Sequence, residues 1–308
     1  MKVYLNNINE NWVVDRFRND WIKNNLEIHA ESIKECQVIW IISPWTWKNT
    51  PKKYLKQKNV LCSIYHLDFE KKNSSEKKEF FKRDKYVDRY HVISKYTYKE
   101  LRNLTEKPIM YLPFWIDEKV FFPIKDKNKI KQKWKVNKKD YLIGSFQRDS
   151  EGKNPKLPKL IKGPDIFFDI VKDIYSNRKE VRVILTGKRR DYLINRLKED
   201  NIPFNYYENI SMQEINELYN ILDMYIVSSR LEGGPQSILE SAITKTPIIS
   251  TDVGIASEIL SEESLFGFDK SYRKAIPNVD YAYTKVQNYK INTLIEKYND
   301  MLVNFNEN

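Results

Sequence analysis

Short apolar runs alternate with longer polar stretches along this chain, and this alternation is the feature that most constrains its fold. A strand that is buried on both faces reads as a short continuous apolar run, as in parallel sheets that helices cover. Such runs predict strands at Val3–Leu5, Val38–Ile42, Val60–Tyr65, Tyr90–Ile93, Ile109–Leu112, Tyr141–Phe146, Val181–Thr186, Phe204–Tyr207, Met224–Val227 and Pro247–Ser250. Helices are predicted between them at Asp15–Asn25, Lys52–Gln57, Ser75–Lys82, Tyr96–Leu104, Ile166–Tyr175, Asp191–Asp200, Met212–Ile221 and Gln236–Thr244. The chain is therefore expected to be α/β, with parallel strands in two successive domains.

The length of 308 residues also fits two domains. A Pro-containing segment, Leu112–Ile124, separates the two series of strands, so we expect an N-terminal domain over residues 1–120 and a C-terminal domain over 121–277. Residues 278–308 have helical spacing and are expected to pack back toward the N-terminal domain. The Lys-rich segment Lys125–Lys139, with eight lysines, predicts a helix with a solvated face.

Composition excludes several classes of protein. The longest apolar run, Val38–Ile42, is far shorter than the ~20 residues of a membrane helix, and no apolar segment of a secretory signal is visible at the start. Cys36 and Cys62 lie inside apolar runs and predict buried reduced thiols in a cytoplasmic protein. The histidines are scattered, so no zinc site is expected. A net charge of +11 permits nucleic-acid binding, although no motif of a known nucleic-acid-binding module is present.

The most specific segment runs from Leu231 to Ser241 and follows a predicted strand directly before a helix. Its Gly233-Gly234-Pro235 sequence allows close backbone approach to a ligand, and proline suits the first helical turn. The N–H groups near Gln236 and Ser237 lie at a positive helix end, which favours phosphate. Glu232 and Glu240 supply carboxylates that can each accept two hydroxyl hydrogen bonds from a sugar or ribose diol. An ordinary Gly-Pro turn with a surface glutamate is the alternative.

Glu232 and Glu240, with seven residues between them, resemble the E-x7-E motif of the retaining family 4 glycosyltransferases, which have the GT-B fold. The resemblance extends over residues 36–260. Further segments that are similar to family motifs, in the same order, are Val60–Asp68, Val87–Ser94, Leu112–Pro123, Gly144–Arg148 with Lys162–Asp165, Leu185–Gly187 and Thr251–Gly254. The resemblance implies two Rossmann-like domains that face a central cleft, with the acceptor on the N-terminal side and the nucleotide sugar on the C-terminal side.

The resemblance also implies roles for individual residues. Glu240 would bind the ribose hydroxyls, and Glu232 with the N–H groups of Gly233 and Gly234 would bind the donor sugar. The loop around Gly187 would contact the nucleotide base. His66 would reach the donor sugar from the opposite domain, although a structural histidine at a strand end is the alternative.

Cleavage of a nucleotide diphosphate sugar leaves negative charge on the diphosphate, which cations and helix ends stabilise. Arg148 and Lys162 are the expected cations, with Lys153, Lys156 and Lys159 as rivals. No Asp-x-Asp sequence occurs, so we expect a metal-independent enzyme without a cofactor, whose donor substrate is the nucleotide diphosphate sugar.

The chain departs from the family pattern at two places. The first glycine is Gly144, so a glycine-rich loop cannot follow the first strand, and the side chains of Asn6 and Asn7 could donate in its place. Thirteen residues, Asp149–Ile161, separate Arg148 from Lys162 and predict a polar loop beside the cleft.

The expected function is transfer of a sugar, with retention of the α configuration, to a glycan or glycolipid acceptor in polysaccharide biosynthesis. Peripheral contact with anionic lipid at the inner face of the membrane would suit the basic N-terminal domain. Four alternatives stay open: a sugar-nucleotide-binding protein with weak or no catalysis, an inverting GT-B transferase, a sugar phosphorylase, and a basic nucleic-acid-binding protein.

Overall fold

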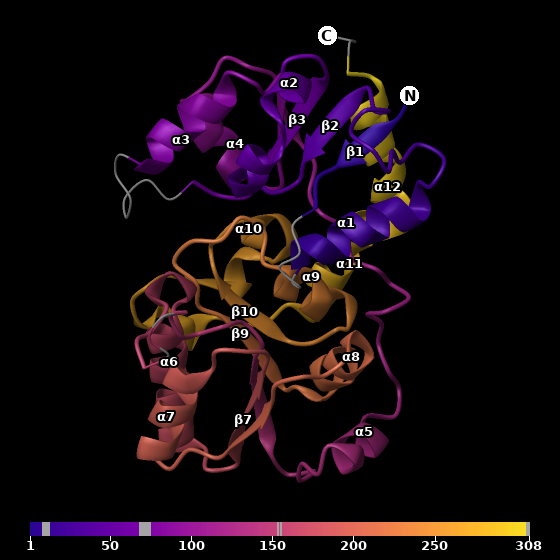
Figure 1. The fold of residues 1–308 in the computed structure, drawn as a ribbon. Helices are drawn as coiled ribbons and strands as arrows, with labels where there is room; N and C mark the ends of the chain where they lie inside the picture. The colour runs from indigo at the N-terminus through magenta and orange to yellow at the C-terminus, as the bar shows by residue number, and fades with distance from the viewer. Residues whose placement is uncertain (8–12, 68–74, 153, 155, 306–308) are drawn as a thin grey trace. The chain divides into compact units, whose positions relative to one another are not determined.

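A computed structural model describes residues 1–7, 13–67, 75–152, 154 and 156–305 of the chain. They form two compact units (Figure 1). The first consists of residues 1–115 together with 291–308, and the second of residues 116–290. Each unit contains its own parallel sheet with helices packed on it.

The N-terminal unit contains a sheet of five parallel strands that follow one another in chain order. The strands are β1 (Val3–Leu5), β2 (Val38–Ile41), β3 (Asn59–Ile64), β4 (Arg89–Val92) and β5 (Ile109–Tyr111). The helices are α1 (Val13–Asn24), α2 (Lys52–Leu55), α3 (Ser75–Asp84), α4 (Lys95–Arg102) and the C-terminal α12 (Ile291–Val303), with a 3₁₀ helix, η1, at Pro44–Asn49. Every residue of β2 and β4 is buried, which explains the continuous apolar sequence of β2, whereas β4 buries the polar side chains of Arg89 and His91.

His91 on β4 is the centre of a buried hydrogen-bond chain in this unit. Its Nε2 lies 2.7 Å from the carbonyl oxygen of Leu112, which can only accept, so Nε2 carries the proton. Its Nδ1 therefore accepts from Ser63 Oγ at 2.8 Å, and Ser63 Oγ accepts from Trp40 Nε1 at 2.9 Å. The hydroxyl of Tyr298 on α12 donates to the same Leu112 carbonyl at 3.1 Å. This chain of contacts ties α12 to the sheet of the N-terminal unit.

The C-terminal unit contains six parallel strands in the order β11-β10-β9-β6-β7-β8. They are β6 (Tyr141–Ser145), β7 (Val181–Thr186), β8 (Phe204–Tyr207), β9 (Met224–Val227), β10 (Ile248–Thr251) and β11 (Leu265–Phe266). When the six strands are numbered within the unit and read from β8 to β11, their order is 3-2-1-4-5-6, as in a Rossmann sheet. The chain adds strands in one direction from β6 to β8 and in the opposite direction from β9 to β11, so the order reverses between the neighbours β6 and β9. Ligands of such sheets bind at the carboxyl ends of the strands beside that reversal.

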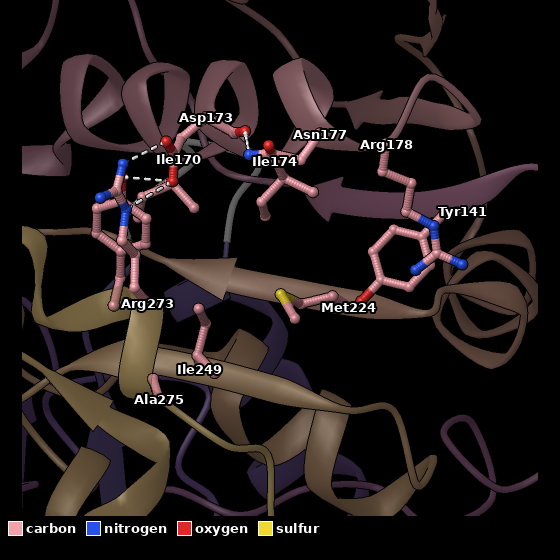
Figure 2. Close-up of a pocket in the computed structure, with 11 residues that line it drawn as sticks. Tyr141, Ile170, Asp173, Ile174, Asn177, Arg178, Met224, Ile249, Arg273 and Ala275 are labelled. Atoms are coloured by element: carbon pink, nitrogen blue, oxygen red, sulfur yellow. Dashed lines mark hydrogen bonds and ion pairs between the residues drawn. The ribbon is translucent and has the colours of Figure 1, made fainter.

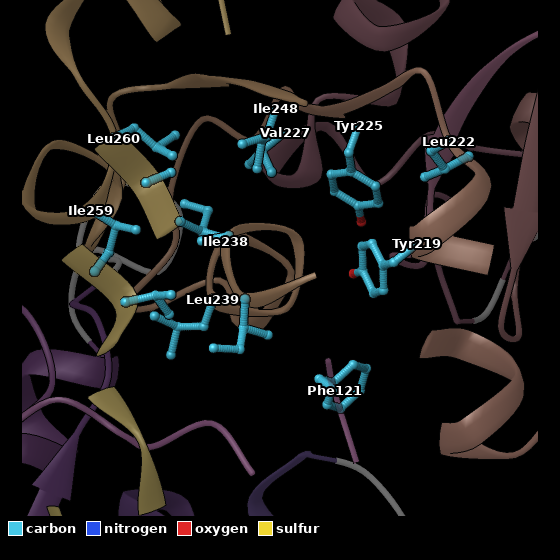
Figure 3. Packing of buried hydrophobic residues seen from close by; sticks show 14 of the residues in the cluster. Phe121, Tyr219, Leu222, Tyr225, Val227, Ile238, Leu239, Ile248, Ile259 and Leu260 are labelled. Atoms are coloured by element: carbon cyan, nitrogen blue, oxygen red, sulfur yellow. The ribbon is translucent and has the colours of Figure 1, made fainter. Parts of the chain in front are cut away.

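Helices cover both faces of this sheet because successive residues of each strand point to opposite sides. Ile143, Leu185 and Ile226 pack against α6 (Pro164–Asn177) and α7 (Asp191–Glu199). Their chain neighbours Leu142 and Tyr225 pack on the other face. That face carries α8 (Met212–Ile221), α9 (Gln236–Ile243), α10 (Ala256–Ile259) and α11 (Val279–Val286), and Figure 3 shows part of its core. The remaining α-helix in the described part of this unit, α5 (Lys127–Lys133), contacts α8.

The ten strands predicted from the sequence are confirmed within one residue at each end. The short β11 and α10 were not predicted, because two to four residues leave too little periodicity to recognise. Lys127–Lys133 is helical inside the Lys-rich segment, with Ile130 as its buried anchor. Cys36 and Cys62 are buried and unpaired, as expected.

Residues 278–308 were expected to pack together toward the N-terminal domain, and for part of them this expectation is wrong. Helix α12 belongs to the N-terminal unit, but α11 packs against α9 in the C-terminal unit. The apolar side chains Ala282 and Val286 of α11 complete the core that α9 leaves open. In the described part of the chain, no helix combines the length and apolar character that are needed to cross a bilayer.

Candidate functional site

The strand reversal of the C-terminal sheet brings together two loops that sequence analysis considered separately. Gln147 follows β6 and Ser229 follows β9, and Ser229 Oγ donates to Gln147 Oε1 at 3.3 Å. The Gln147 amide also donates to the carbonyl of Lys162 at 2.9 Å, so it fixes the segment before α6 to the end of β6. Sequence analysis missed Gln147 and Ser229, because a lone polar residue after a strand carries no local signal.

Lys162 and Glu232 form an ion pair at this edge of the sheet. Ser229 Oγ also lies 3.2 Å from the same carboxylate oxygen, which is an alternative acceptor for its one hydroxyl proton. The two charged side chains retain 23% and 12% of their exposure, so the pair is partly buried and remains accessible from solvent. Two residues predicted for different parts of the donor, the diphosphate and the sugar, therefore contact each other.

Gly163, next to Lys162, is required by its surroundings. Its φ of +61° is in the left-handed region, and a Cβ atom there would lie 1.7 Å from the carbonyl oxygen of Ser228. Ser228 Oγ donates to the Gly163 carbonyl at 2.7 Å. This close approach holds Lys162 against the end of β9 and explains the Lys-Gly sequence physically.

Glu240 is buried on α9 with 8% exposure. The hydroxyl of Tyr219 on α8 donates to Glu240 Oε2 at 3.0 Å, which fixes the orientation of the carboxylate. Burial raises the pKa of Tyr219 well above its ordinary value, and the neighbouring Tyr225 and Glu240 raise it further. Tyr225 accepts a hydrogen bond from the backbone N–H of Phe146 at 3.0 Å, so it links this cluster to β6. The tyrosines were not predicted, since aromatic residues in a helix and a strand look like ordinary core.

The start of α9 lies beside these groups. Pro235 is the N-cap residue, and Gln236 and Ser237 follow as half-buried first-turn residues. The first N–H groups of a helix have no acceptor within the helix and form the positive end of its dipole. Gly233 is buried against Gly254. A Cβ atom added to Gly254 would lie 2.4 Å from the carbonyl oxygen of Gly233. Gly234 is half-buried in the same turn.

Several cations surround this edge of the sheet. Arg148 is half-buried three residues after β6. Lys159 is half-buried as well, and burial lowers its pKa, as do the nearby charges of Arg148, Lys162 and Arg189. Lys156 is exposed, and Lys153 lies outside the described residues. The predicted base contact Gly187 follows β7 with a φ of +81°.

A buried ion pair anchors the segment after β6. Arg190 Nε lies 2.7 Å from Asp149 Oδ2, and both side chains are almost fully buried. The Arg190 guanidinium also donates to Ser145 Oγ at 3.1 Å and to the Thr186 carbonyl at 3.1 Å. Burial raises the pKa of Asp149, and the charge of Arg190 opposes this increase. Neither residue was predicted, because the two are 41 positions apart and belong to no motif.

Of the residues expected in the N-terminal unit, His66 is exposed just after β3. Its reach toward a donor sugar stays a prediction. Asn6 is buried. Its Nδ2 donates to Thr46 Oγ1, and its Oδ1 accepts from the N–H of Ile42 at 3.1 Å. The expectation that Asn6 serves as a ligand donor is therefore wrong, because the side chain joins the ends of β1 and β2. Residues Ile8–Glu10 and Asp68 lie outside the described residues.

A pocket of about 530 Å³ lies at the opposite, amino-terminal ends of the strands of the C-terminal sheet (Figure 2). It is bordered by Tyr141 and Met224, which begin β6 and β9, and by the C-terminal turn of α6. Arg273 closes one side through a bidentate ion pair with Asp173 at 2.5 and 2.9 Å. None of the predicted site residues lines this pocket. Nowhere in the described ranges do three or more His, Cys, Asp or Glu side chains gather to hold a metal ion.

The fold resembles that of several solved structures. HepE of Anabaena, in a crystal structure with UDP and glucose, superposes with a TM-score of 0.76 at 12% identity, over 99% of this chain and 100% of HepE. Sucrose-phosphate synthase of Thermosynechococcus elongatus gives 0.70 at 12% identity, over 97% of this chain and 80% of the synthase. The expected GT-B fold, with two Rossmann-like parallel-sheet domains, is confirmed.

The family comparison concerns the C-terminal unit. Residues 126–276 match the model of the family described as Glycosyl transferases group 1, and Arg148, Lys162, Glu232 and Glu240 all lie inside the match. The match covers 151 of the 308 residues and supports the expected enzyme class, a glycosyltransferase. A protein of Sulfolobus islandicus rod-shaped virus 1, uncharacterized protein 356, is 30% identical over 95 residues. The match spans 30% of this chain and a quarter of the viral protein's length.

Proposed function

We propose that this protein is a retaining glycosyltransferase that transfers a sugar from a UDP-sugar to a glycan or glycolipid acceptor. The observation that carries the proposal is the ion pair of Lys162 and Glu232 just before α9, the helix that carries Glu240, within the residues that match the group 1 glycosyltransferase family model. UDP is the nucleotide of choice because HepE, which has a similar fold, was crystallised with UDP and with UDP-glucose.

In this proposal the diphosphate lies at the start of α9. Lys162 and Arg148 supply fixed positive charge, and the first N–H groups of α9 donate to phosphate oxygens. Donor binding changes the partner of Lys162 from Glu232 to a phosphate oxygen. Glu232 then accepts hydroxyl hydrogen bonds from the donor sugar. The ion pair thus keeps both side chains in place before the substrate arrives.

Glu240 binds the ribose of the nucleotide. Its Oε2 is oriented by Tyr219, so the carboxylate meets the ribose hydroxyls in one orientation. A buried carboxylate that is already hydrogen-bonded loses little entropy on binding, which favours affinity for the donor.

In the transfer step, the bond between the anomeric carbon and the diphosphate oxygen breaks as the acceptor oxygen forms its bond on the same face. The departing phosphate oxygen takes the proton of the acceptor hydroxyl, so no protein base is required. Lys162, Arg148 and the helix end stabilise the charge that develops on the diphosphate. His66 of the N-terminal unit contacts the donor sugar in this scheme.

Ligand binding tests the donor site. A thermal-shift series with UDP-, GDP-, ADP- and dTDP-sugars and CMP-linked sugars should show the largest stabilisation with a UDP-sugar. At a ligand concentration 100 times the dissociation constant, the folded state should be stabilised by about 2.7 kcal/mol. Glu240→Ala should abolish the shift, whereas Glu199→Ala, an exposed residue at the end of α7, should retain it. Equal shifts in the wild type and Glu240→Ala would refute the ribose assignment.

Turnover tests the reaction itself. We expect Glu232→Ala to lower transfer or hydrolysis of the donor sugar more than it lowers UDP affinity. The anomer of the product, followed by NMR, distinguishes retention from inversion, and dependence on free phosphate would indicate a phosphorylase. Donor binding without any turnover would indicate a binding protein. Co-sedimentation with anionic and neutral vesicles tests the proposed membrane contact.

A further inference from the structure

The segment between Arg148 and Lys162 is a closed loop rather than a loose insertion. The Lys159 N–H donates to the Asp149 carbonyl at 2.7 Å, so the two ends of the loop are bonded to each other. At its first end, the N–H groups of Asp149 and Ser150 both donate to the Arg189 carbonyl, at 3.0 and 3.1 Å. The buried ion pair between Asp149 and Arg190 also fixes this end of the loop.

This closure determines where Lys159 lies. Its N–H is bonded to the residue next to Arg148, and its carbonyl accepts from the Lys162 N–H at 2.8 Å. Lys159 therefore lies one short turn from Lys162 and next to the segment of Arg148.

The side chain of Lys159 is half-buried without compensation by an ion pair. Among the described residues, no carboxylate lies within ion-pair distance of its ammonium group. The charges close enough to affect it are the cations Arg148, Lys162 and Arg189 and the acid Glu151. Burial and the three cations lower the pKa of Lys159, and Glu151 opposes this shift. A half-buried ammonium among like charges costs free energy in the unliganded protein, and an anionic ligand removes that cost.

We propose that Lys159 is a third diphosphate-binding cation of this enzyme, held in place by the closed loop between Arg148 and Lys162. The inference rests on the proposed function. The charges support it, because Glu232 already compensates Lys162 in the ion pair, whereas no carboxylate of the described residues lies within ion-pair distance of Lys159. The departing diphosphate gains further negative charge, so the same cation stabilises the transition state.

The test compares Lys159→Met with Lys156→Met, which removes an exposed ammonium from the same loop. Affinities for UDP and UMP are measured by isothermal titration calorimetry. We expect Lys159→Met to weaken UDP binding about tenfold or more, since a hydrogen bond to a charged group is lost. UMP binding should weaken less, because UMP lacks the second phosphate, and Lys156→Met should change neither affinity by more than about twofold.

The outcomes separate the inference from the proposed function. If Lys159→Met binds UDP as the wild type does while Glu240→Ala has lost binding, Lys159 is no diphosphate ligand and the donor site still stands. A wild type that does not bind UDP overturns both. Equal losses for UDP and UMP also overturn the inference, because they indicate general damage to the site. Lys159→Arg, which keeps the charge, should restore most of the UDP affinity, and failure of this variant would contradict a charge-based role.

Discussion

His91 should make the stability of the N-terminal unit depend on pH between about 6.5 and 4. The imidazole is fully buried, and burial lowers its pKa from 6.5 to about 4, although the hydrogen bond to Leu112 partly opposes the shift. Its neutral form fits the hydrogen-bond chain, because Nδ1 accepts from Ser63 while Ser63 accepts from Trp40. A protonated Nδ1 would have to donate to Ser63, and the Ser63 hydroxyl would then need another acceptor.

The sign and the size follow from these values. Below pH 6.5 the unfolded chain binds a proton at His91 that the folded chain does not bind, so stability falls as the pH falls. The contribution of His91 is fully present above about pH 6.5 and is lost toward pH 4. One pKa unit corresponds to about 1.4 kcal/mol, so the loss at pH 4 amounts to about 3 kcal/mol.

The assay is urea unfolding at a series of pH values in the wild type and in His91→Gln, whose side chain does not titrate. His91→Gln should be less stable at pH 7, because its amide cannot reproduce the geometry of the ring, but its stability should fall less between pH 7 and 4. Gln57→Ala, which changes an exposed side chain that carries no ionisable group, is the control and should keep the wild-type slope. Identical slopes in the wild type and His91→Gln would refute the reasoning, as would an NMR titration of His91 near pH 6.5.

Two further predictions concern residues that support the proposed donor site. Asp149→Asn should lower the free energy of unfolding by about 3–5 kcal/mol, because it leaves the buried guanidinium of Arg190 without its counter-charge, and thermal unfolding measures the loss. A change below about 1 kcal/mol would show that the pair contributes little. Gly163→Ala should cost roughly 3 kcal/mol or more, since a Cβ would collide with the Ser228 carbonyl and the left-handed φ is unfavourable for alanine. Wild-type stability and UDP affinity in that variant would contradict the described packing.

The strands and most helices of this protein could be predicted from the sequence, because each is encoded locally. A continuous apolar run such as that of β2 identifies a strand buried on both faces without knowledge of its neighbours. The spacing of Glu232 and Glu240 around the start of α9 is equally local, so the sequence alone pointed to a donor site there. A segment of two residues such as β11 offers no such pattern and was missed.

The contacts that complete the site were decided only by the tertiary structure. The strand order places the end of β6 beside the end of β9, and this brings Lys162 to Glu232 across 70 positions. The buried pair of Asp149 and Arg190 and the support of Glu240 by a tyrosine hydroxyl arise in the same way. Periodicity along a chain records which side of an element is buried, but it does not record which distant element covers that side. The residues of the proposed donor site could therefore be named from the sequence, whereas their partners depended on the fold.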